Sequence, residues 1–270
     1  MPELMPMLLQ EVRFSDKVFK EYEDYIWQEK ENGVRVMLHI KDGKISAVRN
    51  RRNKPVFHLY PELKELEFEK TSAVVDGELV VFQNDKSVFY GGINQRNKLN
   101  KEGAQESFPV TFVAFDLIYL DGDIKIELDY EERYELLHRI FHQHSGKHFM
   151  IADNINNPKR YWKEAIVPDG REGFVIKDPR SPYVPSSRSD KWLKIKNYKI
   201  TELVVEQIET NVKGVRVSGK AKIGSLVCEV DCQYGGIYDI KLGDKLPVEY
   251  LDIVGNKLIQ PHKPRGWKNK

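Results

Sequence analysis

The sequence has few cysteines, no long apolar run and almost no net charge. Its two cysteines, Cys228 and Cys232, lie close together without other metal-ligating residues nearby, which favours reduced side chains over a metal pair or a disulfide. No apolar run approaches the roughly 20 residues that a membrane span needs, and the N-terminus lacks a basic-then-apolar signal sequence. The net charge of +2 argues against a protein that coats nucleic acid. We therefore expect a cytoplasmic protein that does not enter a membrane.

The positive charges are nevertheless unevenly distributed. Residues 49–54 form a basic cluster, and residues 257–270 contain several lysines and arginines but no acidic residue. Basic stretches are often only solvated surfaces. Beside a nucleotide site, however, they would suit contacts with phosphates.

The larger, N-terminal part of the chain predicts antiparallel strands with flanking helices. Residues 35–40 and 45–51 alternate between apolar and polar side chains and are joined by Asp42-Gly43, the pattern of a β-hairpin. Residues 73–82 and 110–120 are apolar runs rich in residues that favour strands. Together they predict a sheet.

Helices are expected at two places in the same part of the chain. Residues 129–144 have one apolar face, with Asp129 as the N-cap and Glu132 at the capping-box position. Asn157-Pro158 has the cap-then-proline pattern of a helix start. This part is therefore predicted to be an α+β domain.

From about residue 200 the pattern changes to short strands separated by glycine turns. No helical pattern interrupts the series, which favours a small all-β barrel of the OB-fold type over a continuation of the first sheet. We predict a domain boundary at residue 197, with an α+β domain over 1–197 and an OB-fold over 198–270. The five expected strands are residues 199–209, 215–223, 225–233, 237–243 and 248–254.

Five clusters of charged and aromatic residues follow one another along the first domain. One lysine beside a glycine is usually a solvated surface group, and Asp-Gly-Glu alone is usually a turn or a bulge. Their order is more informative than any one of them. The clusters are Glu29-Lys30-Glu31-Asn32-Gly33-Val34-Arg35, Asp76-Gly77-Glu78, Phe115-Asp116, Glu172-Gly173 with Lys177, and Trp192-Leu193-Lys194-Ile195-Lys196.

This series resembles the ordered motifs of the covalent nucleotidyltransferases, which comprise ATP-dependent DNA ligases, RNA ligases and mRNA capping enzymes. The resemblance covers Lys30 to Lys196. It is strongest to small ATP-dependent DNA ligases, including the ligase modules of bacterial end-joining systems. It implies that the first domain is a nucleotidyltransferase (adenylation) domain.

The resemblance implies that Lys30 is the nucleophile that attacks the α-phosphate of ATP. A lysine attacks only as a neutral amine, so cations or burial must lower its pKa from about 10.4. The resemblance implies that Lys177, Lys194 and Lys196 contact the phosphate of AMP. Alternation along a strand puts Lys194 and Lys196 on one face with Trp192, while Leu193 and Ile195 enter the core.

Further roles follow from the same resemblance. Magnesium or manganese is expected at Glu78 and Glu172, because Mg²⁺ prefers one or two carboxylates together with phosphates and water. Glu172 and Lys177 are an odd number of residues apart, so either Gly173 marks a bulge or Glu172 lies on the preceding loop. The remaining nucleotide contacts are Gln28 and Glu29, Arg35 and Arg51, and Phe115 for stacking on adenine; the expected DNA contacts are Arg35, Arg51, Arg265 and Lys268.

Three positions depart from the family's motifs. Asn32 stands where relatives have aspartate, which removes one negative charge. Asn53 replaces a glycine in the turn after Arg51, which asparagine tolerates because it enters the left-handed region readily. The C-terminal motif, usually Arg-x-Asp-Lys, is represented only by Lys268-Asn269-Lys270.

The sequence thus predicts a monomeric ATP-dependent DNA ligase that uses ATP and Mg²⁺ and binds nicked duplex DNA. It would seal nicks through a lysyl-AMP and an adenylated DNA. One alternative is an RNA ligase or a capping guanylyltransferase, although capping enzymes usually carry Asp-Gly where this chain has Glu172-Gly173. Another is a degenerate, non-catalytic nucleic-acid clamp, which Asn32 and the weak C-terminal motif favour and the intact Lys30 opposes.

Overall fold

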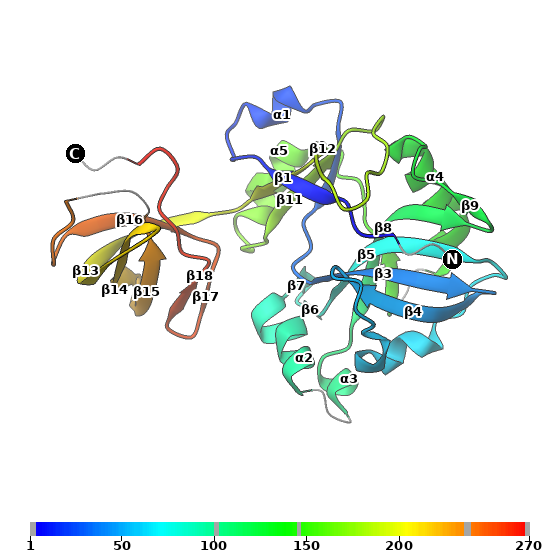
Figure 1. Ribbon diagram of the computed structural model, residues 1–270, viewed down its shortest axis with the longest axis horizontal. Coiled ribbons are helices and arrows are strands. Elements are labelled where there is room, and N and C mark those ends of the chain that lie inside the picture. The colour runs from blue at the N-terminus through cyan, green and yellow to red at the C-terminus, as the bar shows by residue number, and fades with distance from the viewer. Residues whose placement is uncertain (1–3, 100–102, 145–146, 235–238, 268–270) are drawn as a thin grey trace. The chain divides into compact units, whose positions relative to one another are not determined.

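The computed structural model describes residues 4–99, 103–144, 147–234 and 239–267 (Figure 1). The chain divides into two compact units, Met1–Ile195 and Lys196–Lys270. This division falls close to the predicted boundary at residue 197, while the identity of the units as adenylation and OB-fold domains stays a prediction. Within the described residues, no helix is long and apolar enough to cross a membrane.

The first unit contains a six-stranded mixed sheet in the order β10-β8-β5-β3-β4, with β9 paired to β8. Only the β10–β8 pair is parallel. The predicted hairpin is confirmed, since Asp42 and Gly43 join β3 to β4 with φ angles of 51° and 80°. The strands are β3 (Val34–Lys41), β4 (Lys44–Asn50), β5 (Ala73–Val80), β8 (Thr111–Leu120), β9 (Asp123–Ile124) and β10 (Phe149–Ile151).

A four-stranded sheet, in the order β1-β12-β11-β2, completes the first unit together with a small hairpin. β1 runs parallel to β12, so a segment near the N-terminus pairs with the last strand of the unit. The predicted alternation along β12 is confirmed, because Leu193 and Ile195 are buried in a core with Trp27 and Phe174. The strands are β1 (Leu8–Glu11), β2 (Ile26–Glu29), β11 (Gly173–Lys177) and β12 (Arg188–Lys196); β6 (Phe82–Gln83) and β7 (Lys86–Ser87) form the hairpin.

The helices of the first unit are short apart from α4 (Tyr130–Phe141). The predicted capping box is present at its start, with reciprocal hydrogen bonds between Asp129 and Glu132. Its apolar face packs into the core of the six-stranded sheet. The predicted start at Asn157 is also confirmed, since its side chain accepts a hydrogen bond from the Arg160 amide at 3.0 Å. The other α-helices are α1 (Val18–Glu21), α2 (Asn94–Leu99), α3 (Ala104–Ser107) and α5 (Pro158–Tyr161).

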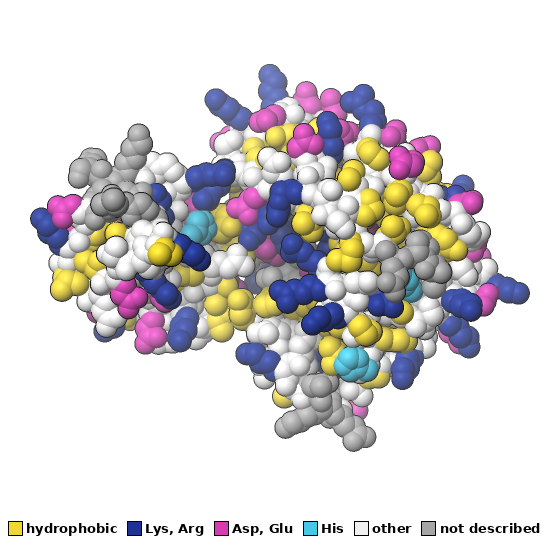
Figure 2. Space-filling view, in the orientation of Figure 1, with side chains coloured by type: hydrophobic (Ala, Val, Ile, Leu, Met, Phe, Trp, Pro, Cys, Tyr) yellow, Lys and Arg dark blue, Asp and Glu magenta, His cyan; other side chains and the backbone are white. Residues whose placement is uncertain are grey.

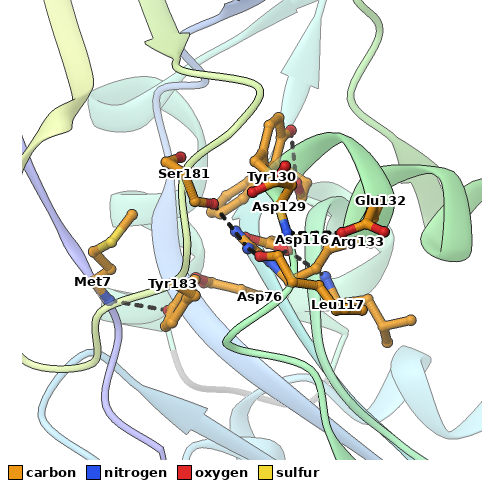
Figure 3. A network of polar contacts seen from close by, with 12 residues as sticks. Met7, Asp76, Asp116, Leu117, Asp129, Tyr130, Glu132, Arg133, Ser181 and Tyr183 are labelled. Atoms are coloured by element: carbon orange, nitrogen blue, oxygen red, sulfur yellow. Dashed lines mark hydrogen bonds and ion pairs between the residues drawn. The ribbon is translucent and has the colours of Figure 1, made fainter.

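Two fully buried aspartates stand opposite each other on β5 and β8. Asp116 accepts two hydrogen bonds from Arg133 of α4, at 2.8 and 2.9 Å. Asp76 accepts one from the Tyr183 hydroxyl at 2.6 Å, and this hydroxyl accepts the Met7 amide at 3.0 Å (Figure 3). The network therefore joins the sheet, α4, the N-terminal segment and the loop before β12.

The second unit is a six-stranded sheet in the order β16-β13-β14-β15-β18-β17. Gly219 allows β14 to approach β13 closely, because a Cβ atom there would lie 1.9 Å from the Val204 carbonyl oxygen. Both cysteines are buried in its core as free thiols. The strands are β13 (Lys199–Asn211), β14 (Gly214–Ile223), β15 (Leu226–Gln233), β16 (Lys245–Tyr250), β17 (Asp252–Val254) and β18 (Lys257–Ile259).

The predicted strand at residues 237–243 is wrong where the structure describes it. Residues 239–243 form no strand, and Gly243 has a φ of 85° in a turn before β16. The Asp244 side chain accepts a hydrogen bond from the Lys241 amide at 2.8 Å. A local side-chain bond of this kind satisfies the backbone without a sheet partner, which the alternating sequence pattern does not reveal.

Candidate active site

Lys30 follows directly after β2 and its ammonium meets Glu172. The Lys30 Nζ atom lies 2.8 Å from Glu172 Oε1, and the two side chains are 20% and 7% exposed. The Lys30 amide donates to the Gly173 carbonyl at 2.9 Å. Glu172 precedes β11, which begins at Gly173 with a φ of 138°. Glu172 therefore lies on the segment before the strand. It does not take part in the alternation of side chains that leads to Lys177, so the odd number of residues between the two is no obstacle to a shared site.

Gly33 holds the turn after Lys30 against β5. A Cβ atom at this position would lie 2.2 Å from the Leu79 carbonyl oxygen and 2.8 Å from side-chain atoms of Glu78 and Val80. Only glycine permits this approach. The turn is thereby fixed beside Glu78, which pairs with Arg35 across the β5–β3 register.

A second ion pair of opposite polarity flanks the Lys30–Glu172 pair. Arg171 Nη1 lies 2.9 Å from Glu29 Oε2, and the Tyr161 hydroxyl donates to the same oxygen at 2.6 Å. Glu29 precedes Lys30 and Arg171 precedes Glu172, so both pairs connect the same two segments. Each of the two segments therefore contributes one cation and one anion.

A pocket opens beside Lys30 between the two sheets of the first unit. It is lined by residues from β1, β2, β3, β5, β8, β11 and β12, and several of them are predicted nucleotide contacts. Gln28 donates to the Ala152 carbonyl and to the Asn154 side chain, each at 3.2 Å, and its oxygen accepts the Tyr130 hydroxyl at 3.3 Å. The lining residues are Leu9, Gln28, Glu29, Lys30, Glu31, Arg35, Glu78, Val113, Phe115, Ala152, Val175, Lys177 and Trp192.

Lys177 is a buried residue of the pocket lining and lies among aromatic rings. Its Nζ atom is 4.4 Å from the centroids of the Phe115 and Tyr130 rings and 4.2 Å from that of Trp192. Burial lowers the pKa of Lys177 well below its usual value, although Asp116 and Asp76 act in the opposite direction. The predicted contact of Lys177 with the AMP phosphate stays a prediction. Besides the rings, its ammonium donates to the Tyr130 hydroxyl at 3.0 Å and to the Phe115 carbonyl at 3.3 Å.

A basic groove begins where the pocket ends. The two share Leu9, Lys30, Arg35 and Glu78. Lysine and arginine side chains gather in a band across this face of the first unit (Figure 2). The lining residues are Leu8, Leu9, Lys30, Gly33, Val34, Arg35, Asn50, Arg51, Arg52, Glu78, Phe89, Arg188 and Lys194.

Arg35 is held by the buried network. Its guanidinium donates to both oxygens of Asp76, at 3.0 and 2.6 Å, and to the Met7 carbonyl at 2.7 Å. The guanidinium carbon also lies 5.3 Å from the centroid of the Phe115 ring. Arg35 therefore has a fixed orientation at the boundary between pocket and groove.

Some predicted site residues are not among those that line the pocket, and their roles stay predictions. Lys194 lines the groove, with its Nζ atom 3.4 Å from Glu11 Oε2. Lys196 is the last residue of β12 and the first residue of the second unit, and it donates to Gln260 at 2.9 Å. Arg265 also belongs to that unit, and Lys268 lies outside the described residues.

Arg52, Arg171 and Arg188 are site residues that the sequence analysis missed. Arg52 could have been found, because it lies inside the basic cluster 49–54. Arg188 and Arg171 belong to no recognised motif. Their places follow only from the pairing of β12 with β1 and of β11 with β2.

The charges around Lys30 keep it protonated in the absence of a nucleotide. Burial lowers the pKa of Lys30, but Glu172 and Glu78 outweigh this effect and raise it. Burial raises the pKa of Glu78 to about 8, against the opposing effect of Lys30 and Arg35. Burial also raises the pKa of Glu31 to about 7.

Glu78 and Glu172 are the residues that could hold a divalent metal ion. Among the described residues no cluster of three or more metal-ligating side chains exists. Mg²⁺ commonly takes only one or two carboxylates and completes its shell with phosphates and water. Both glutamates lie close enough to Lys30 to affect its pKa, so the donor set fits a metal that binds together with a nucleotide.

The raised pKa of Glu78 predicts a pH-dependent stability. Between pH 4.5 and about 8 the folded protein retains a proton that the unfolded chain has released, so the free energy of unfolding falls as pH rises. Glu78→Gln is expected to remove about 2 kcal/mol of this loss between pH 6 and 8.5. Denaturant titrations followed by tryptophan fluorescence measure it, with Glu131→Gln on the exposed side of α4 as the control. The expectation would be contradicted if the free energy of unfolding fell equally steeply with pH in Glu78→Gln and in the unmodified protein.

Comparisons with known proteins show the family to which the chain belongs. Residues 6–196 match the family model of the ATP dependent DNA ligase domain. DNA ligase 2 of Korarchaeum cryptofilum is 29% identical over 221 residues, which cover 77% of this chain and 37% of that protein. The SPbeta prophage-derived DNA ligase-like protein LigB of Bacillus subtilis is 31% identical over 202 residues, covering 74% and 70%. The solved ligase domain of M. tuberculosis LigD is similar with a TM-score of 0.57 at 18% identity, covering 97% of this chain and 94% of that domain.

The matched residues amount to more than half of the chain, so the chain belongs to the ATP-dependent DNA ligase family. The predicted resemblance is thereby confirmed. The likeness to the LigD domain concerns the fold, a pair of mixed sheets with few helices followed by a β-rich unit. The chain spans about a third of the length of the Korarchaeum ligase and most of the length of LigB.

Proposed function

We propose that the chain is an ATP-dependent DNA ligase that seals nicks between a 5′-phosphate and a 3′-hydroxyl. The observation that carries the proposal is the position of Lys30. Its amine stands where a pocket that includes aromatic and aliphatic side chains meets a groove that includes several arginines and lysines. Such an amine has access both to a bound nucleotide and to a phosphate backbone.

The pocket is suited to the adenosine part of ATP. Phe115 offers an aromatic ring for stacking on adenine, and Val175 adds an apolar contact from β11. Gln28 is held by three hydrogen bonds at the inner end, where its amide oxygen has a second lone pair for the adenine amino group. The α-phosphate would then lie at the outer end, beside Lys30.

Lys30 would carry the adenylate through two displacements at phosphorus. Its neutral amine attacks the α-phosphorus, an N–P bond forms and the bond to pyrophosphate breaks. An oxygen of the DNA 5′-phosphate then attacks the same phosphorus and the N–P bond breaks, returning the amine. Finally the 3′-hydroxyl attacks the 5′-phosphate and AMP leaves. Mg²⁺ or Mn²⁺ held by Glu78 and Glu172 would offset the charge of the phosphates and of both carboxylates, which favours the neutral form of Lys30.

Nicked duplex DNA is the proposed partner, bound by the monomeric protein. Arg51, Arg52, Arg188 and Lys194 line the groove and can neutralise backbone phosphates. The β-rich second unit is proposed to be an OB-fold, a fold that commonly binds nucleic acid. Arg265 and Lys268 are proposed to contribute DNA contacts from this unit.

The groove predicts the salt dependence of DNA binding. Each phosphate contact that is removed should reduce the slope of log K against log salt by about 0.9. Arg52→Ala and Arg188→Ala are therefore each expected to flatten the slope by about that amount, whereas Arg139→Ala on α4 should leave it unchanged. Binding to a nicked duplex, measured by fluorescence anisotropy at several salt concentrations, gives the slopes. Unchanged slopes for both groove variants would remove the groove from the DNA interface.

Incubation with radiolabelled ATP or GTP, followed by a sealing assay, tests the proposal. An adduct with ATP alone and sealing of a nicked DNA duplex are the expected results. An adduct with GTP would indicate a capping enzyme instead. Sealing of RNA in preference to DNA would indicate an RNA ligase, and the absence of any adduct would indicate a non-catalytic clamp.

A further inference from the structure

The hairpin β6–β7 has its own locally determined geometry. Asn84 and Asp85 join its strands, with φ angles of 50° and 56°. Two successive residues with positive φ are characteristic of the tight turns that match the twist of hairpin strands. The hairpin forms a separate two-stranded sheet, so its contacts with the rest of the unit come from individual side chains and from its ends.

One of these contacts reaches the turn that carries Lys30. The buried hydroxyl of Ser87 accepts a hydrogen bond from the backbone N–H of Asn32 at 2.8 Å. The same side chain is hydrogen-bonded to the carboxylate of Glu31. The turn after Lys30 is therefore held from two directions, by Ser87 on one side and by the bond from the Lys30 amide to Gly173 on the other.

A second contact reaches the segment that carries Glu172. The Lys86 ammonium donates to the Asp169 carbonyl at 2.8 Å. The Asp169 carboxylate in turn accepts a hydrogen bond from Arg171 Nε at 3.1 Å. Arg171 also pairs with Glu29, so the contact that begins at Lys86 ends beside both members of the Lys30–Glu172 pair.

We propose that the hairpin β6–β7 sets the position of Lys30 relative to Glu172, and that Ser87 is a positioning residue for formation of the lysyl adduct. The inference rests on the proposed function of Lys30. Ser87 contacts the turn that carries Lys30, and the adjacent Lys86 contacts the segment that carries Glu172. Displacement of a reacting group by about 1 Å can reduce a rate by about 10²-fold, so loss of one such contact is sufficient to slow the first step.

Ser87→Ala tests the inference in the chain with both units present. It removes the acceptor of the Asn32 amide, and we expect the rate of adduct formation with labelled ATP to fall at least tenfold. Sealing of a nick that already carries 5′-AMP should stay within twofold, because that step does not use the lysyl adduct. Ser87→Thr, which keeps a hydroxyl, should recover most of the rate. Thr71→Val is the matched control, since it removes another buried hydroxyl at a residue that lines neither the pocket nor the groove.

A second pair of variants keeps the inference testable if Ser87→Ala folds poorly. Lys86→Met retains the apolar stem but loses the donor to Asp169, and it should also slow adduct formation selectively. Lys44→Met is its control, because Lys44 makes a comparable surface contact with Glu67 on another hairpin, with a Nζ–Oε1 distance of 3.2 Å. Unchanged adduct formation in both hairpin variants, or an equal loss in both reaction steps, would overturn the inference. A lack of adduct in the unmodified protein would instead overturn the proposed function.

Discussion

Lys30→Ala is expected to abolish the ATP-dependent adduct, with a loss of more than about 10⁴-fold in the rate of the first step. Among the described residues that line the pocket and the groove, the other amines are those of Lys177 and Lys194, and neither is placed to replace it. Lys177 is enclosed by aromatic rings, and Lys194 lies beside Glu11 in the groove. Lys30→Arg should be equally inactive, because a guanidinium is not deprotonated at any pH at which the protein is folded. Denaturing electrophoresis of the protein after incubation with labelled ATP measures the adduct.

The control for this experiment is a substrate that bypasses the first step. A nick prepared with 5′-AMP should still be sealed by Lys30→Ala, since only the 3′-hydroxyl and the activated phosphate then react. Lys125→Ala, at a residue that contacts Asp123 on the β8–β9 hairpin, should form the adduct normally. An adduct of normal yield on Lys30→Ala would assign the nucleophile to a different residue.

Arg133→Leu is expected to destabilise the first unit by about 3–5 kcal/mol. The Arg133–Asp116 pair is fully buried, with both side chains 0% exposed. Removal of the guanidinium would leave the Asp116 carboxylate without its partner in the core, and would also remove the donor to the Ser181 carbonyl. Denaturant unfolding of the two proteins measures the difference in the free energy of unfolding.

Two comparisons separate this effect from a simple loss of packing. Replacement of both partners by leucine should cost less than Arg133→Leu alone, because no charge is then left buried. Arg160→Ala should cost less than about 0.5 kcal/mol, since its pair with Glu164 on the surface is 71% and 61% exposed. A loss for Arg133→Leu as small as that of Arg160→Ala would show that the buried pair contributes little to stability.

Local patterns predicted the elements that local interactions determine. The Asp42-Gly43 turn, the capping box of α4 and the cap at Asn157 depend on residues within a few positions of one another. The alternation along β12 was also predictable, because it follows from the pleat of a strand. The order of the five motifs predicted that Lys30 and Glu172 belong to one site, and the structure brings them within hydrogen-bonding distance.

Features that depend on distant segments could not be read from these patterns. The enclosure of Lys177 needs Phe115, Tyr130 and Trp192 from three separate elements. Arg188 enters the groove because β12 lies beside β1, a pairing that has no signal in either strand. Residues 237–243 alternate like a strand, but their described part leads into a turn, where the Lys241 amide donates to the Asp244 side chain.

The parallel pairing of β1 with β12 also bears on the order in which the protein folds. Leu9 of β1 and Trp192 of β12 line the same pocket, although almost the whole first unit separates them in the sequence. Contacts between such distant residues form slowly, because a long loop must close before they gain any stability. During synthesis, the N-terminal strand must wait until β12 has left the ribosome. The pocket beside Lys30 is therefore expected to be among the last parts of the first unit to form, after the six-stranded sheet has assembled from neighbouring hairpins.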